Sequence, residues 1–329
     1  MTLTQTAILT KQIINTTIVS IVLGIISFVG YQMWYSYYLS TLPPVEEKPD
    51  TKFGVLPYPN FPKSGVSSSN FSYSLDTVTG GLPKIGQDSG FDKLSKVYFV
   101  IKPYATFLSP DKSQALAEKF NITNPPDVVS ETIYRFKQDS KTLTVDLDSG
   151  NFAYINEASP SAFENTLNEN QLVNDFKNTL SRIGVLKDEL RDGRSKVIGA
   201  QISLWPKDLD NKSIFTPALL KSHVWARVGK SAANIEDYLS LDFTYFQIDT
   251  STFATYPTKL TEEAFNDLKN GKGTVLVEPE KPQVSITSVS LGYFLPDTYN
   301  PYIQPIYIFE GPSFVSYVPA ISNEFLKEN

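Results

Sequence analysis

The stretch TIYRFKQDSKTLTVDLDSGNFAYI, residues 132–155, carries the clearest information about the fold of this chain. Three segments rich in β-branched and aromatic residues predict strands at Thr132–Phe136, Leu143–Leu147 and Phe152–Ile155. Asp148-Ser149-Gly150 separates the last two segments, and its glycine can adopt the positive φ that a hairpin turn requires. Residues 132–155 therefore predict antiparallel strands joined by a tight turn.

Helical patterns lie on both sides of these strands. Ser109-Pro110-Asp111 predicts the start of a helix that ends at Phe120, with Ser109 as its N-cap. Apolar residues recur at helical spacing from Gln171 to Leu190 and predict a second helix. Helices beside antiparallel strands are typical of the α+β class.

The second half of the chain repeats this theme. A short helix is predicted at Thr261–Leu268, with Thr261 as its cap and Glu262 and Glu263 in its first turn. The other predicted strands are Lys96–Ile101, Val197–Trp205, Ser222–Val228, Leu241–Ile248, Ser285–Phe294, Pro305–Phe309 and Phe314–Val318. The order strand, short helix, antiparallel strands occurs near 96–155 and near 241–318, which indicates a possible internal duplication. We expect two antiparallel-sheet modules with short packed helices, at residues 71–195 and 196–329.

An apolar segment near the N-terminus predicts one transmembrane helix at residues 12–38. No charged residue lies between Lys11 and Glu46, and residues 18–29 read IVSIVLGIISFV. A helix needs about 20 apolar residues to cross a bilayer. The aromatic residues at its far end are typical of a membrane-interface belt: Tyr31, Trp34, Tyr35, Tyr37 and Tyr38. A cleaved signal peptide is the alternative, but this apolar core is long and bulky residues precede Ser40, so an uncleaved anchor is favoured.

The charges beside this helix predict its orientation. Lys11 precedes the helix, whereas Glu46 and Glu47 are the first charges after it. The positive-inside rule places residues 1–11 in the cytoplasm and the C-terminal part outside the cell membrane. Residues 39–70 are rich in proline and serine, and we expect them to form an extended linker that holds the domain off the membrane.

The composition of the 329 residues excludes several classes of function. The net charge is −6 and the pI is about 5.0, which does not fit a nucleic-acid-binding protein. Cysteine is absent, so disulfides, thiolate metal sites and cysteine nucleophiles are excluded.

Two parts of the chain resemble known families. The strand pattern after Phe120, with the hairpin residues Leu143, Val145, Asp146 and Gly150, resembles the PepSY type of extracytoplasmic module. The segments TYPTKLTEEAFNDLKNGKG, SVSLGYF and YIQPIYIFEG of the second half are similar to the YycH/YycI-like regulators. These regulators have a single anchor, and their outer domains modulate a membrane histidine kinase. The resemblance implies a non-enzymatic role in restraining or sensing a protein of the cell envelope.

Two short motifs have simpler structural explanations. Ser109 and Lys112 match the S-x-x-K pattern of penicillin-binding proteins, but the companion motifs are missing and a helix start is favoured. Asp146, Asp148 and Glu157 have the spacing of some calcium-loop ligands, but they lie between predicted strands and a hairpin turn is favoured.

Other polar residues do not assemble into a predicted site. His223 is the only histidine, so a histidine-based metal site or catalytic triad has no partners of its own kind, and a structural role is favoured. Glu262 and Glu263 are explained by a helix N-terminus. We therefore predict no catalytic, cofactor-binding or metal-binding residues.

An aromatic and proline-rich segment near the C-terminus is the one candidate for partner binding. Tyr293, Tyr299, Tyr302 and Tyr307 flank or lie within a predicted loop at residues 295–304. Tyrosines in such a loop offer rigid contact area to a partner, although strand core plus a rigid loop is the favoured explanation. We expect a non-enzymatic, membrane-anchored binding or regulatory protein that acts on an envelope protein. A glycan-binding protein, a hydrolase that uses carboxylates, and a structural envelope subunit remain alternatives.

Overall fold

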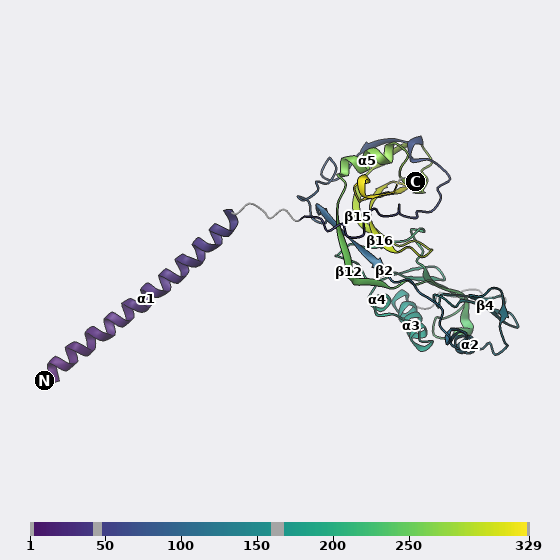
Figure 1. Cartoon of the computed structure of the whole chain (residues 1–329), viewed down its shortest axis with the longest axis horizontal. Coiled ribbons are helices and arrows are strands. Elements are labelled where there is room, and N and C mark those ends of the chain that lie inside the picture. The colour runs from purple at the N-terminus through teal and green to yellow at the C-terminus, as the bar shows by residue number, and fades with distance from the viewer. Residues whose placement is uncertain (1–2, 42–47, 159–167, 328–329) are drawn as a thin grey trace. The chain divides into compact units, whose positions relative to one another are not determined.

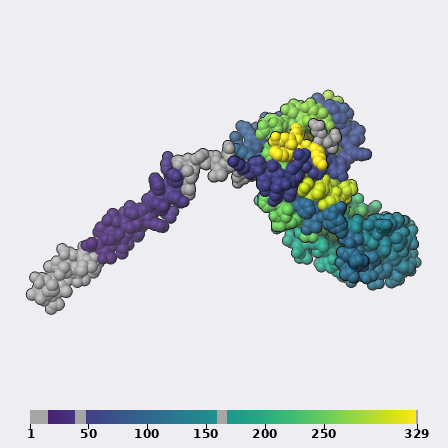
Figure 2. All heavy atoms as spheres, in the orientation of Figure 1, coloured from purple at the N-terminus to yellow at the C-terminus, as the bar shows by residue number. Residues whose placement is uncertain are grey.

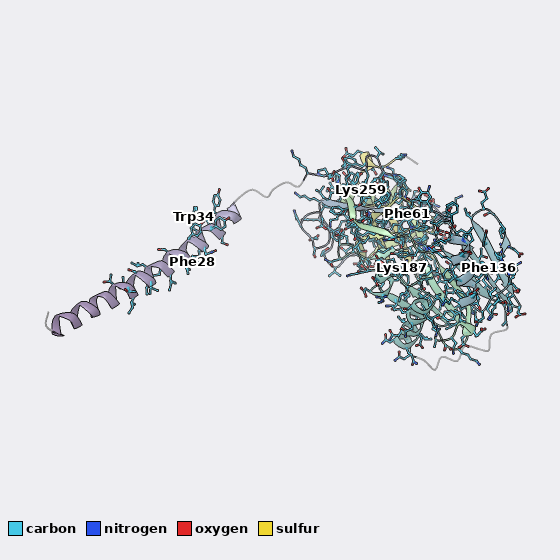
Figure 3. The ribbon with its side chains drawn as sticks, turned by 60° about the horizontal axis from the view of Figure 1, so that its bottom comes forward. Phe28, Trp34, Phe61, Phe136, Lys187 and Lys259 are labelled. Atoms are coloured by element: carbon cyan, nitrogen blue, oxygen red, sulfur yellow. The ribbon has the colours of Figure 1, made fainter. Side chains whose placement is uncertain are left out.

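The computed structural model describes residues 3–41, 48–158 and 168–327, and the chain divides into two compact units, Met1–Lys48 and Pro49–Asn329. The first unit contains helix α1 (Leu3–Thr41), shown in purple in Figure 1. Its segment Thr16–Tyr38 has a mean hydropathy of 1.7, and no part of that segment is buried against other described residues. Side chains such as Phe28 and Trp34 project outward from the helix (Figure 3). This helix is long and apolar enough to span a membrane.

Aromatic side chains gather at the C-terminal end of α1. Tyr31 stacks on Tyr35 with ring centroids 6.0 Å apart, and Trp34 stacks on Tyr38 at 5.7 Å. The five predicted belt residues are all exposed: Tyr31, Trp34, Tyr35, Tyr37 and Tyr38. Helix α1 is longer than the predicted span 12–38, because it also includes residues 3–11 of the expected tail. Residues 1–2 of that tail and 42–47 of the expected linker lie outside the described residues.

The second unit has the predicted α+β architecture, and its largest sheet has eight strands. The strand order is β3-β4-β5-β6-β11-β10-β8-β7, and all neighbouring pairs are antiparallel. Its strands are β3 (Asp127–Val128), β4 (Ile133–Gln138), β5 (Lys141–Asp146), β6 (Phe152–Asn156), β7 (Ser195–Ile198), β8 (Gln201–Leu204), β10 (Val224–Val228) and β11 (Tyr238–Phe243). The expected boundary between 195 and 196 therefore falls inside this sheet, within strand β7.

A second large sheet is built mainly from the C-terminal strands. Its order is β12-β2-β16-β15-β9, and β17 pairs with both β16 and β13. These strands are β2 (Leu94–Val100), β9 (Ile214–Phe215), β12 (Ile248–Pro257), β13 (Thr274–Val277), β15 (Ser288–Phe294), β16 (Tyr302–Gly311) and β17 (Phe314–Pro319). A small parallel pair joins β1 (Ser72–Leu75) to β14 (Gln283–Ile286).

Strands β2 and β12 of the second sheet lead the chain into and out of the first sheet. They are antiparallel, with Leu94 opposite Pro257 at one end and Val100 opposite Ile248 at the other. After β2 the chain passes to helix α2 and the first sheet, and after β11 it returns along β12 to helix α5. Figure 1 shows β2 and β12 between the elements around β15 and those around α3. The two halves of the chain are thus interleaved.

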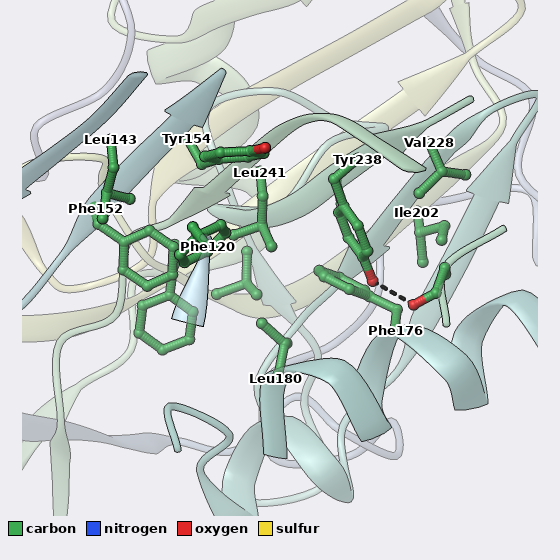
Figure 4. Packing of buried hydrophobic residues seen from close by; sticks show 14 of the residues in the cluster. Phe120, Leu143, Phe152, Tyr154, Phe176, Leu180, Ile202, Val228, Tyr238 and Leu241 are labelled. Carbon is green, nitrogen blue, oxygen red and sulfur yellow. Dashed lines mark hydrogen bonds between the residues drawn. The ribbon is translucent and has the colours of Figure 1, made fainter. Parts of the chain in front are cut away.

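The first hydrophobic core lies between the eight-stranded sheet and helices α2 (Ser109–Lys119) and α3 (Glu169–Arg182). Asn168 caps α3 by accepting a hydrogen bond from the Gln171 N–H, and Phe176 is buried against the sheet. Figure 4 shows this packing around Phe120 and Tyr238. The predicted helix Gln171–Leu190 is in fact two helices, because Gly184 adopts a φ of +83° and a short helix α4 (Asp188–Arg191) follows.

The second core packs helix α5 (Thr261–Lys269) against β16 and β17. Ala264, Phe265 and Leu268 of α5 meet Tyr307 and Phe309 of β16. Short 3-10 turns complete the fold at Ser68–Asn70, Ile235–Asp237 and Asn323–Phe325.

The described part of the proline-rich segment lies on the second unit instead of standing free. Leu56 is buried, its N–H donates to the Phe325 carbonyl (2.8 Å), and its carbonyl accepts from the Lys327 N–H (2.9 Å). Phe61 meets Phe294 edge-on at 4.9 Å. In Figure 2 the dark blue atoms of this segment lie against the yellow C-terminal atoms. Residues 49–62 differ from the expected stalk, because their apolar side chains find partners at the other end of the chain.

Candidate functional site

The hairpin between β5 and β6 is fixed by its own polar side chains. The Asp146 carboxylate accepts hydrogen bonds from the Asp148 N–H (3.0 Å) and the Ser149 hydroxyl (2.7 Å). The Gly150 N–H donates to the Asp146 carbonyl (2.7 Å), and Gly150 adopts a φ of +71°. This conformation confirms the predicted turn and leaves a rigid hairpin tip at residues 146–151.

The loop between β2 and α2, residues 101–108, is attached to this hairpin. The Ala105 N–H donates to the Asp148 carboxylate (3.0 Å). The Thr106 N–H donates to the Ser109 hydroxyl (3.0 Å), so Ser109 orders the loop and is not the N-cap of α2 that the sequence predicts. Leu108 occupies the N-cap position and has no side-chain hydrogen bond to the helix.

A pocket of about 550 Å³ lies between α2, the hairpin tip and the loop after α3. Leu116, Val145 and Phe243 contribute apolar surface to it, and three lysines also line it: Lys112, Lys119 and Lys187. We call this site the hairpin pocket. Its volume is typical of ligand sites, which combine apolar walls with a few polar groups.

The lysines and the aspartates that line the hairpin pocket differ in the contacts they already make. Lys112, Lys119 and Lys187 are exposed, and within the described ranges none of the three forms an ion pair. The carboxylates of Asp146 and Asp148 also line the pocket, but both accept hydrogen bonds from the hairpin and the neighbouring loop. The pocket therefore offers apolar walls and available ammonium groups, a combination suited to an apolar ligand that carries carboxylates.

A second pocket of about 410 Å³ is also lined by residues of this hairpin. Asp148 and Asn151 line it from the hairpin, Phe246 from the chain before β12, and Asp297 and Tyr299 from the loop before β16. The same hairpin tip thus contributes to both concave surfaces.

The four predicted partner-binding tyrosines do not form one exposed surface. Tyr293 and Tyr307 are buried, and their hydroxyls donate to the Asp210 carboxylate (3.0 Å) and the Lys259 carbonyl (2.6 Å). Burial raises the pKa of both. These two rings belong to the cores.

The other two tyrosines are half-buried. The hydroxyl of Tyr299 donates to the Val100 carbonyl (3.2 Å), and its ring meets Phe246 edge-on beside the second pocket. Tyr302 stacks on Phe53 of the proline-rich segment at 4.8 Å. Tyr299 is therefore the one member of this group that contributes to a pocket described above.

The remaining predicted motifs are placed as follows. The Nε2 of His223 donates a hydrogen bond to the Leu295 carbonyl (3.0 Å), and burial lowers the pKa of this histidine. Among the described residues no cluster of three His, Cys, Asp or Glu side chains could hold a metal ion. Ser109 and Lys112 both line the hairpin pocket, but no hydrogen bond joins their side chains.

Sequence reasoning missed the lysines of the hairpin pocket. They come from α2 and from the loop after α3, so nothing in their spacing along the chain brings them together. It also missed the loop at residues 101–108, although an uncharged run flanked by two prolines, PYATFLSP at residues 103–110, was visible. The residues that do carry a pattern, Val145, Asp146 and Gly150, line the pocket.

Comparison with known proteins gives only distant likenesses. No protein-family model and no curated protein matches the chain. Among solved structures, the chain is similar to the C-terminal domain of YpeB from Bacillus megaterium, with 9% identity, a TM-score of 0.29, and coverage of 68% of this chain and 95% of that one. It is also similar to an uncharacterised protein from Eubacterium rectale, with 12% identity, a TM-score of 0.28, and coverage of 74% and 87%. The resemblance is weak. It does not place the chain in a family.

Proposed function

We propose that this protein is a non-enzymatic, membrane-anchored binding module that engages a protein partner of the cell envelope through the hairpin pocket. Helix α1 anchors it, the N-terminus lies in the cytoplasm, and the second unit lies outside the cell membrane. The observation that carries the proposal is the pocket itself, where apolar walls lie beside three exposed lysines that form no ion pair with any described residue.

The chemistry of the pocket favours a partner segment with an apolar side chain and nearby carboxylates. The apolar side chain would pack on Leu116, Val145 and Phe243. The carboxylates would meet Lys112 and Lys187, which contribute to the rate and specificity of association more than to its strength. Binding of this kind restrains or senses the partner and needs no chemical step.

Site-directed crosslinking in native membranes tests this proposal. A photoreactive amino acid replaces Lys112 in the full-length chain, and the matched control replaces Lys281, an exposed lysine outside the pocket. We expect one defined protein adduct from position 112 and none of the same mass from position 281. Adding Lys187→Glu to the first variant should reduce the yield of that adduct roughly tenfold, because the reversed charge repels a carboxylate.

Two results would contradict the proposal. One is an adduct pattern at position 112 that matches the pattern at position 281. The other is an adduct whose yield does not respond to Lys187→Glu, because the lysines would then play no part in recognition.

A further inference from the structure

The loop at residues 101–108 exposes more apolar surface than an ordinary turn. Phe107 is 104% exposed, Tyr104 is 67% exposed and Leu108 is 58% exposed. Ile101 is exposed as well. Single exposed apolar residues are normal, but four in one short loop mark a contact surface.

The charges around this loop follow a definite pattern. No charged residue lies between Pro103 and Pro110, whereas Lys102 precedes this run and Lys112 follows it. Asp111, in the first turn of α2, is the one acidic residue between Lys102 and Lys112. Apolar and aromatic side chains beside lysines are the composition of segments that lie in a membrane interface.

The loop is held in a defined shape. Asp148 accepts the hydrogen bond from Ala105, and Ser109 accepts the one from Thr106. The Lys102 ammonium lies 5.2 Å from the centre of the Tyr104 ring. These contacts fix the backbone that carries Phe107 and Leu108. The loop therefore loses little further conformational entropy when it makes a contact.

The length of the tether limits where this loop can be. Residues 39–48 join the apolar span to the second unit, and the chain from Tyr38 to Pro49 can extend at most about 40 Å. The second unit receives the tether at Asp50, whose N–H donates to the Thr255 hydroxyl (2.8 Å) on β12. Asp50 therefore stays within about 40 Å of the C-terminal end of the apolar span.

The loop lies within reach of the membrane from this attachment point. Thr255 pairs with Lys96 of β2, and Ile101 follows Lys96 at a distance of about 17 Å along an extended strand. A contact within one tethered molecule also has a high effective concentration, so few side chains are needed.

We propose that the loop at residues 101–108 rests on the bilayer surface on the side where the second unit lies. Phe107 and Leu108 enter the boundary between headgroups and acyl chains, and Lys102 faces the lipid phosphates. This contact is separate from recognition of a partner in the hairpin pocket, and it holds that pocket close to the membrane.

The absence of native cysteine permits a clean test in lipid alone. The full chain is labelled through Thr106→Cys with a polarity-sensitive dye and reconstituted into vesicles of mixed zwitterionic and anionic phospholipid. The matched control is Thr79→Cys, because Thr79 adjoins Val78, which is 103% exposed but lies on another loop. We expect blue-shifted emission at position 106 and severalfold stronger quenching there by a nitroxide carried on the lipid. The double substitution Phe107→Ser and Leu108→Ser should remove that difference.

Several outcomes would overturn the lipid contact. A dye at position 106 that responds only to a water-soluble quencher, as at position 79, would do so. Quenching that survives the double serine substitution would also do so, since the apolar tip would not be its cause. Protection of position 106 in native membranes but not in pure lipid would assign the loop to a protein partner instead. Because the vesicles contain no other protein, these results are independent of the crosslinking test.

Discussion

The buried Tyr154 carries a hydroxyl that no described residue meets within hydrogen-bonding distance. Its ring packs against Phe120 at 4.5 Å between centroids, so the apolar part of the side chain is well placed. Replacing Tyr154 with Phe removes an unpaired polar group and should raise the free energy of unfolding by about 1 kcal/mol. Chemical denaturation of the full chain in detergent measures this change.

Tyr307 provides the matched control for this substitution. It is equally buried, but its hydroxyl donates to the Lys259 carbonyl at 2.6 Å. Tyr307→Phe should therefore lower the free energy of unfolding by about 1 kcal/mol. Equal effects of the two substitutions would show that the hydroxyl of Tyr154 does have a partner.

A buried ion pair joins Lys259, two residues before α5, to Asp267 in the last turn of that helix. The Lys259 ammonium, whose side chain is only 1% exposed, lies 2.6 Å from the Asp267 carboxylate, and Lys272 approaches the other oxygen at 3.2 Å. Burial lowers the pKa of Lys259 although Asp267 opposes the shift. Burial works to raise the pKa of Asp267, but Lys259 and Lys272 outweigh it and hold that pKa below its usual range.

Asp267→Asn should lower the free energy of unfolding by about 3–5 kcal/mol at neutral pH, because it leaves a buried ammonium without its partner. In the native chain, the contribution of Asp267 is present above its unfolded pKa of about 3.9 and is lost as the pH falls through its lower folded pKa. The variant lacks this acid-dependent loss. It should instead regain stability as the pH rises towards the unfolded pKa of Lys259, about 10.4, since the buried ammonium then loses its proton.

Denaturation curves from acid to alkaline pH measure both effects. The double substitution Lys259→Met and Asp267→Leu serves as the control, because removal of both charges is close to neutral in comparable pairs. A double variant as unstable as Asp267→Asn would mean that lost packing, and not the unpaired charge, causes the destabilisation.

At the scale of single elements, the hairpin tip depends on one glycine. Gly150 adopts a φ of +71°, and a Cβ added there would meet nothing within 4 Å. Gly150→Ala therefore adds only backbone strain and should cost about 1–2 kcal/mol. Gly65→Ala is the control, since that position has the same free space without a positive φ.

Gly150→Ala and Gly65→Ala also test whether the conformation of the hairpin affects partner binding. Denaturation gives the two free energies, and crosslinking from position 112 gives the effect on the hairpin pocket. We expect Gly150→Ala to reduce the adduct yield and Gly65→Ala to leave it unchanged. Equal stability of the two alanine variants would contradict the strain argument.

At the scale of the whole molecule, sequence patterns predicted the structural features that depend on residues close together in the chain. The apolar helix, the α+β class and the turn at Gly150 follow from local periodicity and turn chemistry. Helix caps were harder to predict from local sequence patterns. Thr261 was expected to cap α5, but its hydroxyl donates to the Pro83 carbonyl, a residue far away in the chain.

Features that depend on distant partners could not be predicted from the sequence. The proline-rich segment carries the marks of a free linker, and only the folded chain brings Leu56 to Phe325. Strand β15 is buried on both faces from Leu291 to Phe294. Its sequence therefore has no alternation of polar and apolar residues that would mark the Tyr293 ring as buried. The lysines of the hairpin pocket meet for the same reason, through the fold and not through spacing.

The pairing of β2 with β12 and β16 has a consequence for how the chain acquires its structure. A chain delivered from its amino end presents β2 long before residues 248–257 and 302–303 arrive to pair with it. Until then, an apolar strand with open backbone groups is available to the wrong neighbour. The second sheet must therefore await nearly the entire polypeptide, and long-range pairing of this kind is intrinsically slow. Premature termination before residue 302 would leave β2 without its β16 neighbour and so expose a strand edge that can pair with another chain.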